Sequence, residues 1–398
     1  MRIHRSQSRL TFRRQRRRSG CVSLLLLLGI VVGTVAVTWS WLERRQQSAN
    51  PPDDLLAAAQ NAFDRGDLDL AITFARQYLA LHPAHPPAIR LLARALIYRS
   101  YSEYNRGVDR ESALQLTTEA LENSPGNLEL LAVHAFALQA AQQPASAAEA
   151  ARRVLEQNPN HTLARTALAL AYGGAGSYEI ALRESLQAVQ SASVADALDA
   201  LRALAIGYGD LGNYQEAART VERALTFNDK LVSLYFERAL YALQLGDADG
   251  ATVAYFQVLV HDPDNVKARL RLCELSSMLR EHQAALDYCG EVTRRAPSWA
   301  DGWYQLGREH FLQGNFAAAQ QNLHRCSSLQ VMQNVPVSER RFECWYLQGQ
   351  AAQILGDCEA LIATYNEFRS MAATEEIQQT WVYPPEGPPG CVTVTSDE

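Results

Sequence analysis

The chain has 398 residues, of which 37 are Lys or Arg and 43 are Asp or Glu, and its formal net charge is −6. With 47% hydrophobic and 20% charged residues, the composition excludes a disordered chain and a membrane protein with many spans. The first 20 residues contain eight Arg and no acidic residue, which leaves 29 basic residues against 43 acidic ones elsewhere. That remainder has a net charge of −14, which argues against nucleic acid as a partner, because phosphate binding needs a basic face.

Residues 1–20 form a basic head, and residues 21–42 contain no charged side chain. As a helix with a rise of about 1.5 Å per residue, this segment extends about 33 Å, which is enough to cross a hydrocarbon core of about 30 Å. The positive-inside rule then predicts a single-pass protein of the cytoplasmic membrane, with its head in the cytoplasm and its body outside. The competing interpretation is a cleaved signal peptide, with Thr34, Val35 and Ala36 as its cleavage signal.

Gly29 and Gly33 lie one helical turn apart in the apolar segment. This spacing lets two membrane helices approach closely, so a homodimer through these glycines is one hypothesis. The alternative is that they have no such role, because glycine is common in membrane helices. Residues 43–53 are polar and are interpreted as a linker.

A pattern of glycines and prolines recurs between residues 54 and 373. Pro125 and Pro159 are 34 residues apart, and so are Gly212 and Gly246. A fixed period of about 34 residues is typical of a solenoid of helical hairpins, which must stack because one hairpin cannot bury its apolar face alone. The sequence predicts an all-α fold with nine units that start near residues 52, 86, 128, 162, 198, 232, 266, 300 and 342.

The unit that begins at Ala300 carries the residues of a known repeat at the expected spacing: Trp303, Leu306, Gly307, Gly314 and Ala319. In this pattern the body resembles the tetratricopeptide repeat family. The resemblance implies a right-handed superhelical solenoid whose concave groove binds a protein or a peptide. It also implies that small residues let the two helices of a unit pack closely. They are Ala71, Ala147, Ala181, Ala217, Ala251, Ala285 and Ala319.

Two units are longer than the period, with extra residues around Tyr98–Val108 and Val331–Ser338. Insertions in such repeats usually form loops, often on the binding face. Residues 374–398 are rich in Pro and Gly, and they are predicted to form an extended, mobile tail.

Six of the seven cysteines lie in the last third of the chain. Because this part is predicted to be exported, disulfides are expected. In the register of the repeat, Cys273 and Cys289 face each other across one unit, and a disulfide between them is predicted. Three pairings remain open for the other four, which are Cys326, Cys344, Cys358 and Cys391. The alternative is that the cysteines are reduced and buried as small apolar side chains.

No motif of an enzyme, a nucleotide site or a metal site occurs in the sequence. His82 and His85 lie close together, but no Cys, Asp or Glu lies near enough in sequence to complete a metal site. The sequence therefore predicts a protein that is not an enzyme and that has no metal and no cofactor.

In the tetratricopeptide family, the first helix of each unit lines the concave groove. Transferring that register to this chain gives nine candidate groove residues. They are Arg202, Phe236, Lys267, Leu270, Glu274, Tyr304, Arg308, Phe311 and Tyr346. Aromatic and Arg side chains are favoured anchors at binding surfaces. The alternative is that some of these residues pack between units.

Two functions fit these expectations. The first is a membrane-anchored extracytoplasmic scaffold that mediates protein–protein interaction during complex assembly. The second is a substrate-presenting or regulatory subunit of a membrane enzyme complex, for example in polysaccharide or cytochrome maturation. Identification of the partner separates them, because a structural partner favours the scaffold and a catalytic partner favours the subunit.

Overall fold

The computed structural model describes residues 52–373, 381–383, 387–388 and 391. The chain divides into two compact units, Met1–Leu55 and Leu56–Glu398, and the fold described below belongs almost entirely to the second. In the described residues the regular structure is entirely helical, with eighteen α-helices and one short 3-10 helix. The all-helical prediction is confirmed for this part of the chain.

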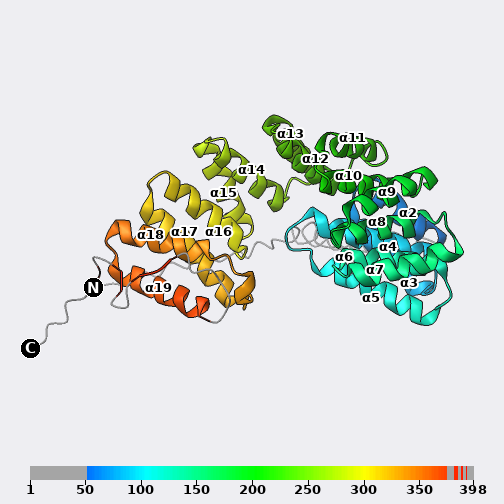
Figure 1. Ribbon diagram of the computed structural model, residues 1–398, viewed down its shortest axis with the longest axis horizontal. Coiled ribbons are helices and arrows are strands. Elements are labelled where there is room, and N and C mark those ends of the chain that lie inside the picture. The colour runs from blue at the N-terminus through cyan, green and yellow to red at the C-terminus, as the bar shows by residue number, and fades with distance from the viewer. Residues whose placement is uncertain (1–51, 374–380, 384–386, 389–390, 392–398) are drawn as a thin grey trace, which may run out of the picture. The chain divides into compact units, whose positions relative to one another are not determined.

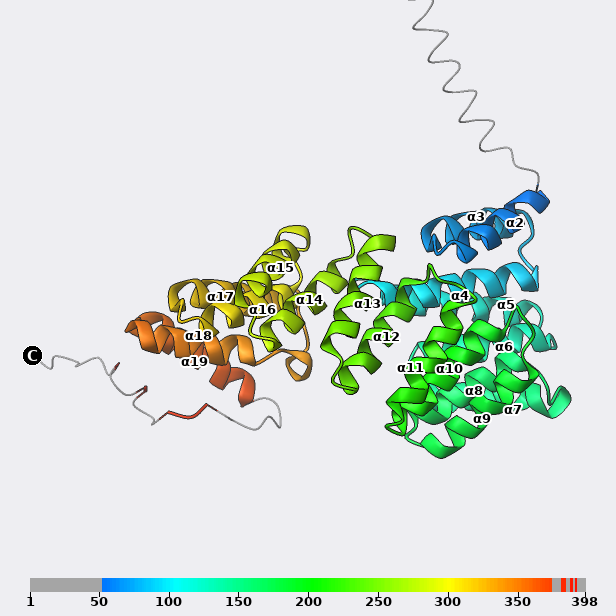
Figure 2. The ribbon, with the colours of Figure 1, turned by 90° about the horizontal axis from the view of Figure 1, so that it is seen from above.

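The helices form nine antiparallel pairs that follow one another in chain order (Figures 1 and 2). The first helices are α2 (Pro52–Asp64), α4 (Pro86–Ser102), α6 (Leu128–Ala140), α8 (Thr162–Gly174), α10 (Ala197–Asp210), α12 (Val232–Gln244), α14 (Val266–Met278), α16 (Ala300–Leu312) and α18 (Glu343–Leu355). The second helices are α3 (Leu68–Leu81), α5 (Val108–Asn123), α7 (Pro144–Gln157), α9 (Tyr178–Ser191), α11 (Tyr214–Leu225), α13 (Ala248–His261), α15 (His282–Arg295), α17 (Phe316–Met332) and α19 (Cys358–Ala372). The 3-10 helix η1 is Val337–Glu339.

Tight turns join the two helices of most pairs. Six of these turns contain a glycine with φ between 72° and 78°. The third and seventh pairs lack this glycine, and there Gln142 and Arg280 adopt φ values of 62° and 61°. Asparagine and aspartate often cap the following helix, as Asp67 does by accepting a hydrogen bond from the Leu70 N–H at 3.1 Å.

The helix pairs pack through small side chains. The seven alanines predicted for this role are at most 3% exposed. Larger side chains then fill the space between pairs, and Phe63, Phe136 and Trp345 are among the most deeply buried. Because each pair buries its apolar face against its neighbours, the core runs along the solenoid rather than forming one centre.

Within the described residues, no helix is both long enough and apolar enough to cross a membrane. The predicted membrane helix at residues 21–42, with Gly29 and Gly33, lies outside the described residues. The same is true of the basic head at 1–20 and of most of the linker at 43–53.

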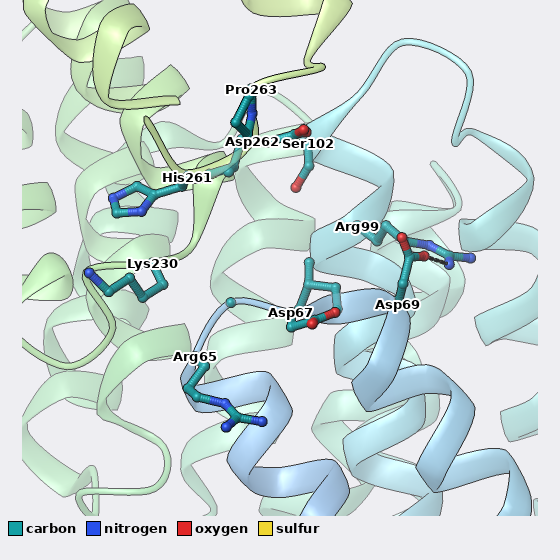
Figure 3. A pocket seen from close by; sticks show the side chains of 12 residues that line it. Arg65, Asp67, Asp69, Arg99, Ser102, Lys230, His261, Asp262 and Pro263 are labelled. Carbon is teal, nitrogen blue, oxygen red and sulfur yellow. Dashed lines mark hydrogen bonds and ion pairs between the residues drawn. The ribbon is translucent and has the colours of Figure 1, made fainter. Parts of the chain in front are cut away.

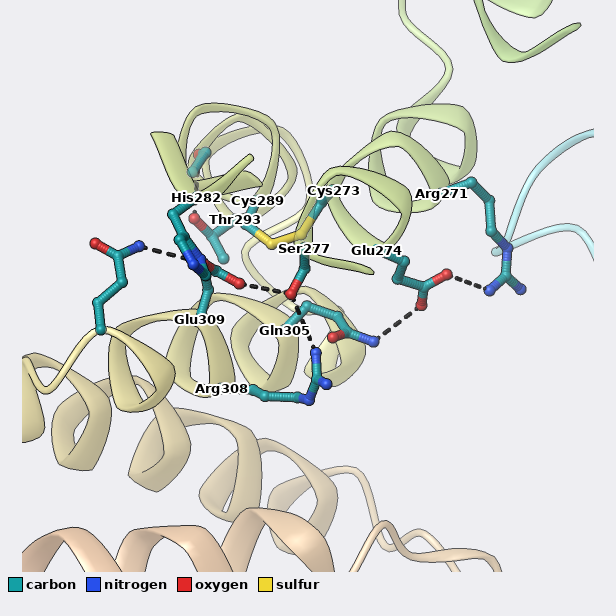
Figure 4. The surroundings of a disulfide bond; sticks show 12 residues. Arg271, Cys273, Glu274, Ser277, His282, Cys289, Thr293, Gln305, Arg308 and Glu309 are labelled. Carbon is teal, nitrogen blue, oxygen red and sulfur yellow. Dashed lines mark hydrogen bonds and ion pairs between the residues drawn. A yellow bond between two sulfur atoms is a disulfide. The ribbon is translucent and has the colours of Figure 1, made fainter. Parts of the chain in front are cut away.

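Three disulfides join the six cysteines of the last third of the chain. Cys273 on α14 pairs with Cys289 on α15, with 5.3 Å between their Cα atoms (Figure 4). This is the pair that the repeat register predicts. The other bridges are Cys326–Cys344, between α17 and α18, and Cys358–Cys391, which links α19 to the tail.

Two segments that the sequence marks as irregular contact helices. In the insertion at Tyr98–Val108, α4 continues to Ser102, and Glu103 contacts the start of α14. In the tail, Trp381 is only 4% exposed and packs against α19.

Candidate functional site: the inner face of the solenoid

Charged and aromatic residues fill the inner face where α4 meets α10. The Tyr98 hydroxyl is buried and donates a hydrogen bond to Asp199 Oδ1 at 2.7 Å. Arg94 Nε lies 2.8 Å from the other oxygen of Asp199. Burial and the Asp199 carboxylate raise the pKa of Tyr98 well above its ordinary value, so the hydroxyl remains a donor. Tyr98 and Asp199 are both buried, so neither side chain is accessible to a ligand.

A buried ion pair continues this network towards α12. Arg202 Nε donates a hydrogen bond to Glu237 Oε1 at 2.6 Å, and Arg202 is 8% exposed. Its guanidinium also lies 4.5 Å from the centre of the Tyr101 ring. Burial raises the pKa of Glu237, and the charge of Arg202 opposes that effect. Because both charges are largely removed from water, each of them is stabilised only while the other is present.

The end of α4 also contacts the start of α14, and we call this contact the clasp. The Glu103 carboxylate accepts hydrogen bonds from the N–H groups of Val266 at 2.8 Å and Lys267 at 3.0 Å. Asn265 Nδ2 donates to the Ser102 carbonyl at 2.9 Å. The two bonds to Glu103 satisfy the first N–H groups of α14 with one side chain from the second helix pair.

Two further contacts complete the clasp. Lys267 Nζ donates a hydrogen bond to the Tyr101 carbonyl at 2.6 Å, and the rings of Tyr104 and Trp299 stack with 4.0 Å between their centres. Burial and the neighbouring Arg271 lower the pKa of Lys267 to about 8. The inserted residues of the second pair thus hold the seventh and eighth pairs rather than presenting a binding loop.

A second contact between distant parts of the chain lies at the turn between α2 and α3. Asn228 Nδ2 donates to the Phe63 carbonyl at 3.0 Å, and Gly66 lies against the backbone of Lys230. A cavity of about 410 Å³ lies beside this contact. Figure 3 shows the cavity between the turn, which carries Arg65, and the segments that carry Lys230 and His261.

A larger hollow opens on the inner face of the first pairs, and we call it the inner hollow. It has a volume of about 630 Å³ and is lined by residues of α2, α4 and α6 and of the loops before α10 and α12. Val194 and Phe227 are its exposed apolar side chains, 82% and 45% accessible to solvent. They lie in the two loops, where nothing in the described chain covers them.

Charged side chains of the inner hollow are held in place by ion pairs. Arg90 donates a hydrogen bond to Glu129 Oε1 at 3.0 Å and a second one to Asp196. A hydrogen bond with His161 at 3.1 Å lowers the pKa of Glu129, helped by the charge of Arg90 and opposed by burial. The hollow thus combines fixed polar groups with exposed apolar ones, as sites for peptides and small molecules commonly do.

Four of the nine predicted groove residues lie in contacts within the chain rather than on an open face. Arg202 and Lys267 bond to Glu237 and to α4 as described above. Phe236 is half-buried, with Lys267 Nζ 4.4 Å from its ring centre. Leu270 is 3% exposed and belongs to the core. Contacts with α4 and the neighbouring helices cover these four side chains.

The other five lie on α14, α16 and α18, and all of them except Tyr304 are partly exposed. Glu274 accepts hydrogen bonds from Arg271 at 2.6 Å and Gln305 at 2.9 Å, and Arg308 donates to Ser277 at 3.2 Å (Figure 4). Tyr304 is buried and Phe311 is half-buried. Tyr346 is 36% exposed, with its ring 6.0 Å from that of Trp381.

Val194 and Phe227 were not among the predicted groove residues. The family register considers only the first helix of each unit, whereas these side chains belong to loops between units. A sequence signal exists for Val194, which is the single large apolar residue in an otherwise small or polar turn, whereas the turn that carries Phe227 also contains Leu231. In the described part of the chain, no group of His, Cys, Asp or Glu side chains could hold a metal ion.

Comparison with known proteins supports the repeat assignment. Residues 202–268 match the tetratricopeptide repeat family model. The fold is similar to the APC/C hetero-tetramer Cut9-Hcn1, with 14% identity, a TM-score of 0.54, and coverage of 77% of this chain and 57% of that chain. It is also similar to the human IFIT1 dimer with m7Gppp-AAAA, with 15% identity, a TM-score of 0.50, and coverage of 79% and 80%. No curated protein sequence matches the chain.

Identities this low show the fold alone. The chain spans little more than half of the Cut9-Hcn1 chain that it resembles. The family match is confined to residues 202–268, and the described helices as a whole are similar in fold to these structures.

Proposed function

We propose that this protein is a membrane-anchored tetratricopeptide scaffold that binds a segment of a partner protein in the inner hollow during assembly of an extracytoplasmic complex. The observation that carries the binding site is the pairing of exposed Val194 and Phe227 with fixed charges on the same hollow. The clasp and the buried ion pairs occupy the inner face around α10, α12 and the start of α14. The inner hollow, with its volume of about 630 Å³, leaves room for a partner beside these contacts.

A partner that fits the hollow has an apolar side chain flanked by polar groups. The apolar side chain would cover Phe227 and Val194, which are otherwise exposed to water. The polar groups would meet Arg90 and Glu129 at the floor of the hollow. Because hydrogen bonds already hold these two side chains in place, orienting a ligand would cost them little side-chain entropy.

Replacing Phe227 with Ala is expected to weaken partner binding about 10-fold, because the variant loses roughly 1–2 kcal/mol of apolar contact. A photoreactive amino acid at position 227 would first trap and identify the partner in cells. The dissociation constant of the purified partner would then be measured for the wild type and the variant.

The matched control is Phe256→Ala on α13. Phe256 is 42% exposed, close to the 45% of Phe227, but it does not line the hollow. This variant should bind like the wild type. Equal losses for the two variants would place the partner elsewhere.

The proposed anchor rests on the eight Arg of residues 1–20 and the uncharged run at 21–42. The full chain is expected to stay in the membrane pellet after carbonate extraction, and a chain without residues 1–42 is expected in the supernatant. Protease should digest the helical body in right-side-out vesicles but not in inverted ones. Recovery of a shortened chain in the soluble fraction would instead support a cleaved signal peptide.

A further inference from the structure

The three disulfides differ in their access to solvent. Cys273, Cys289, Cys326 and Cys344 are at most 1% exposed. Cys358 and Cys391 are both only half-buried. Because thiol–disulfide exchange requires direct approach to a sulfur atom, the third bridge is the one that a dissolved thiol can reach.

This accessible bridge tethers a tail segment to the last helix pair. Trp381 packs against α19, with its ring centre 5.3 Å from that of Tyr365 and 5.6 Å from that of Phe368. The Tyr383 hydroxyl donates a hydrogen bond to Gln353 at 3.0 Å, and the Tyr383 N–H donates to the Tyr365 hydroxyl at 3.2 Å. The segment Trp381–Tyr383 therefore binds to α18 and α19 as a short peptide without regular secondary structure.

A glycine on α18 makes room for the tryptophan. A Cβ atom at Gly349 would lie 2.0 Å from Cη2 of Trp381, so no larger residue fits while the tryptophan is bound. In earlier pairs the second helix packs against the first helix of the next pair. At α19, the last helix described, Trp381 covers part of the equivalent apolar face.

We propose that Cys358–Cys391 is an exchange site for a protein dithiol and that its reduction releases the Trp381 segment from α18 and α19. A thiolate of the reductant attacks Sγ of Cys391 and forms a mixed disulfide, and Cys358 leaves as a thiolate. Cys358 is the first residue of α19, where the positive end of the helix favours the departing negative charge. The second thiol of the reductant then displaces Cys391.

The exchange transfers two electrons from the reductant to the chain. The reductant becomes a disulfide, and the chain gains two thiols. The covalent tether across 33 residues is then lost, and Trp381 is held only by its noncovalent contacts. This inference concerns the end of the solenoid and does not rest on the inner hollow or on the membrane anchor.

The test uses the full chain in detergent with a thioredoxin-type dithiol protein as the reductant. New thiols are alkylated at intervals and mapped by mass spectrometry. We expect Cys358 and Cys391 to be modified at least about 10-fold faster than the other four cysteines, because those are buried. Equal rates for the three bridges would overturn the assignment of the exchange site.

Release of the tail is measured on the same samples by its cleavage with a protease. Cleavage after Trp381 by chymotrypsin is expected to rise several-fold on reduction, because Val382 follows Trp381 whereas Pro384 blocks cleavage after Tyr383. The double variant Cys358→Ser with Cys391→Ser should show the higher rate without any reductant and should not respond to it. Unchanged cleavage in both the reduced wild type and the variant would show that the bridge does not hold the tail.

Discussion

Replacing Arg202 with Met is expected to lower the free energy of unfolding by about 3–5 kcal/mol, because the change leaves Glu237 as an unpaired buried carboxylate. Arg202 is 8% exposed and bonds to Glu237 at 2.6 Å. The loss should be measured by urea unfolding monitored by circular dichroism at pH 7. It exceeds the effect expected for an exposed ion pair, which is about 0–1 kcal/mol.

The matched control removes both charges. The double variant Arg202→Met with Glu237→Leu should recover most of the loss, because two apolar side chains replace the pair without leaving a charge behind. If the double variant is as unstable as the single one, then packing of Arg202 on Tyr101 and not its charge accounts for the effect.

The stability loss of the Arg202→Met variant should depend on pH in a definite direction. Burial raises the pKa of Glu237 in the folded protein above the value in the unfolded chain. A carboxyl group of this kind opposes folding when it is ionised, and the opposition disappears as the pH falls through the folded pKa. The loss in Arg202→Met should therefore shrink towards acidic pH, down to the unfolded pKa of about 4.3. A constant difference between pH 5 and pH 8 would contradict this explanation.

Gly66→Ala is expected to destabilise the protein by about 2–4 kcal/mol, for two separate reasons. Gly66 has φ of 75°, which L-residues other than glycine adopt at a cost of about 1–2 kcal/mol. A Cβ at this position would also lie 2.5 Å from the carbonyl oxygen of Lys230, which is a backbone atom and cannot rotate away. The contact between the α2–α3 turn and the loop before α12 would have to open.

Gly212→Ala is the matched control, because Gly212 has the same φ of 75° but no atom within 4 Å of its would-be Cβ. This variant should show the backbone cost alone. The difference between the two variants, measured by thermal unfolding, therefore isolates the contact with Lys230. Equal losses would mean that the loop moves aside without cost.

The pairwise helical fold is predictable from the sequence because its signal is local and repeats. Proline and glycine end helices at a fixed interval, and each unit contains the residues for its own hairpin. The nine expected starts lie within one residue of the observed first helices, from Pro52 in α2 to Glu343 in α18. The small residues that allow close packing are equally visible.

The candidate site is much less predictable. The register tells which side of a helix faces inward, but it does not tell what lies opposite that side. Glu103 and Val266 are 163 residues apart, and their hydrogen bond depends on how the whole solenoid winds. No periodic pattern in the sequence predicts a contact between residues so far apart. For the same reason, the register predicts Arg202 as an open groove residue.

The tail shows a related limit. Its Pro and Gly content predicts an extended chain, and Trp381–Tyr383 have no regular secondary structure. Composition cannot show that one tryptophan fits the space left by Gly349 on α18.

The clasp also affects how the protein should unfold. Solenoids with contacts only between neighbours lose their repeats one by one from the ends, because each boundary contributes independently. The clasp joins the second pair directly to the seventh, so the pairs between them cannot open separately without breaking it. Hydrogen exchange should therefore show α4 to α15 protected as one cooperative block, whereas α16 to α19, which the clasp contacts only through Trp299, open at lower free energy as a second block.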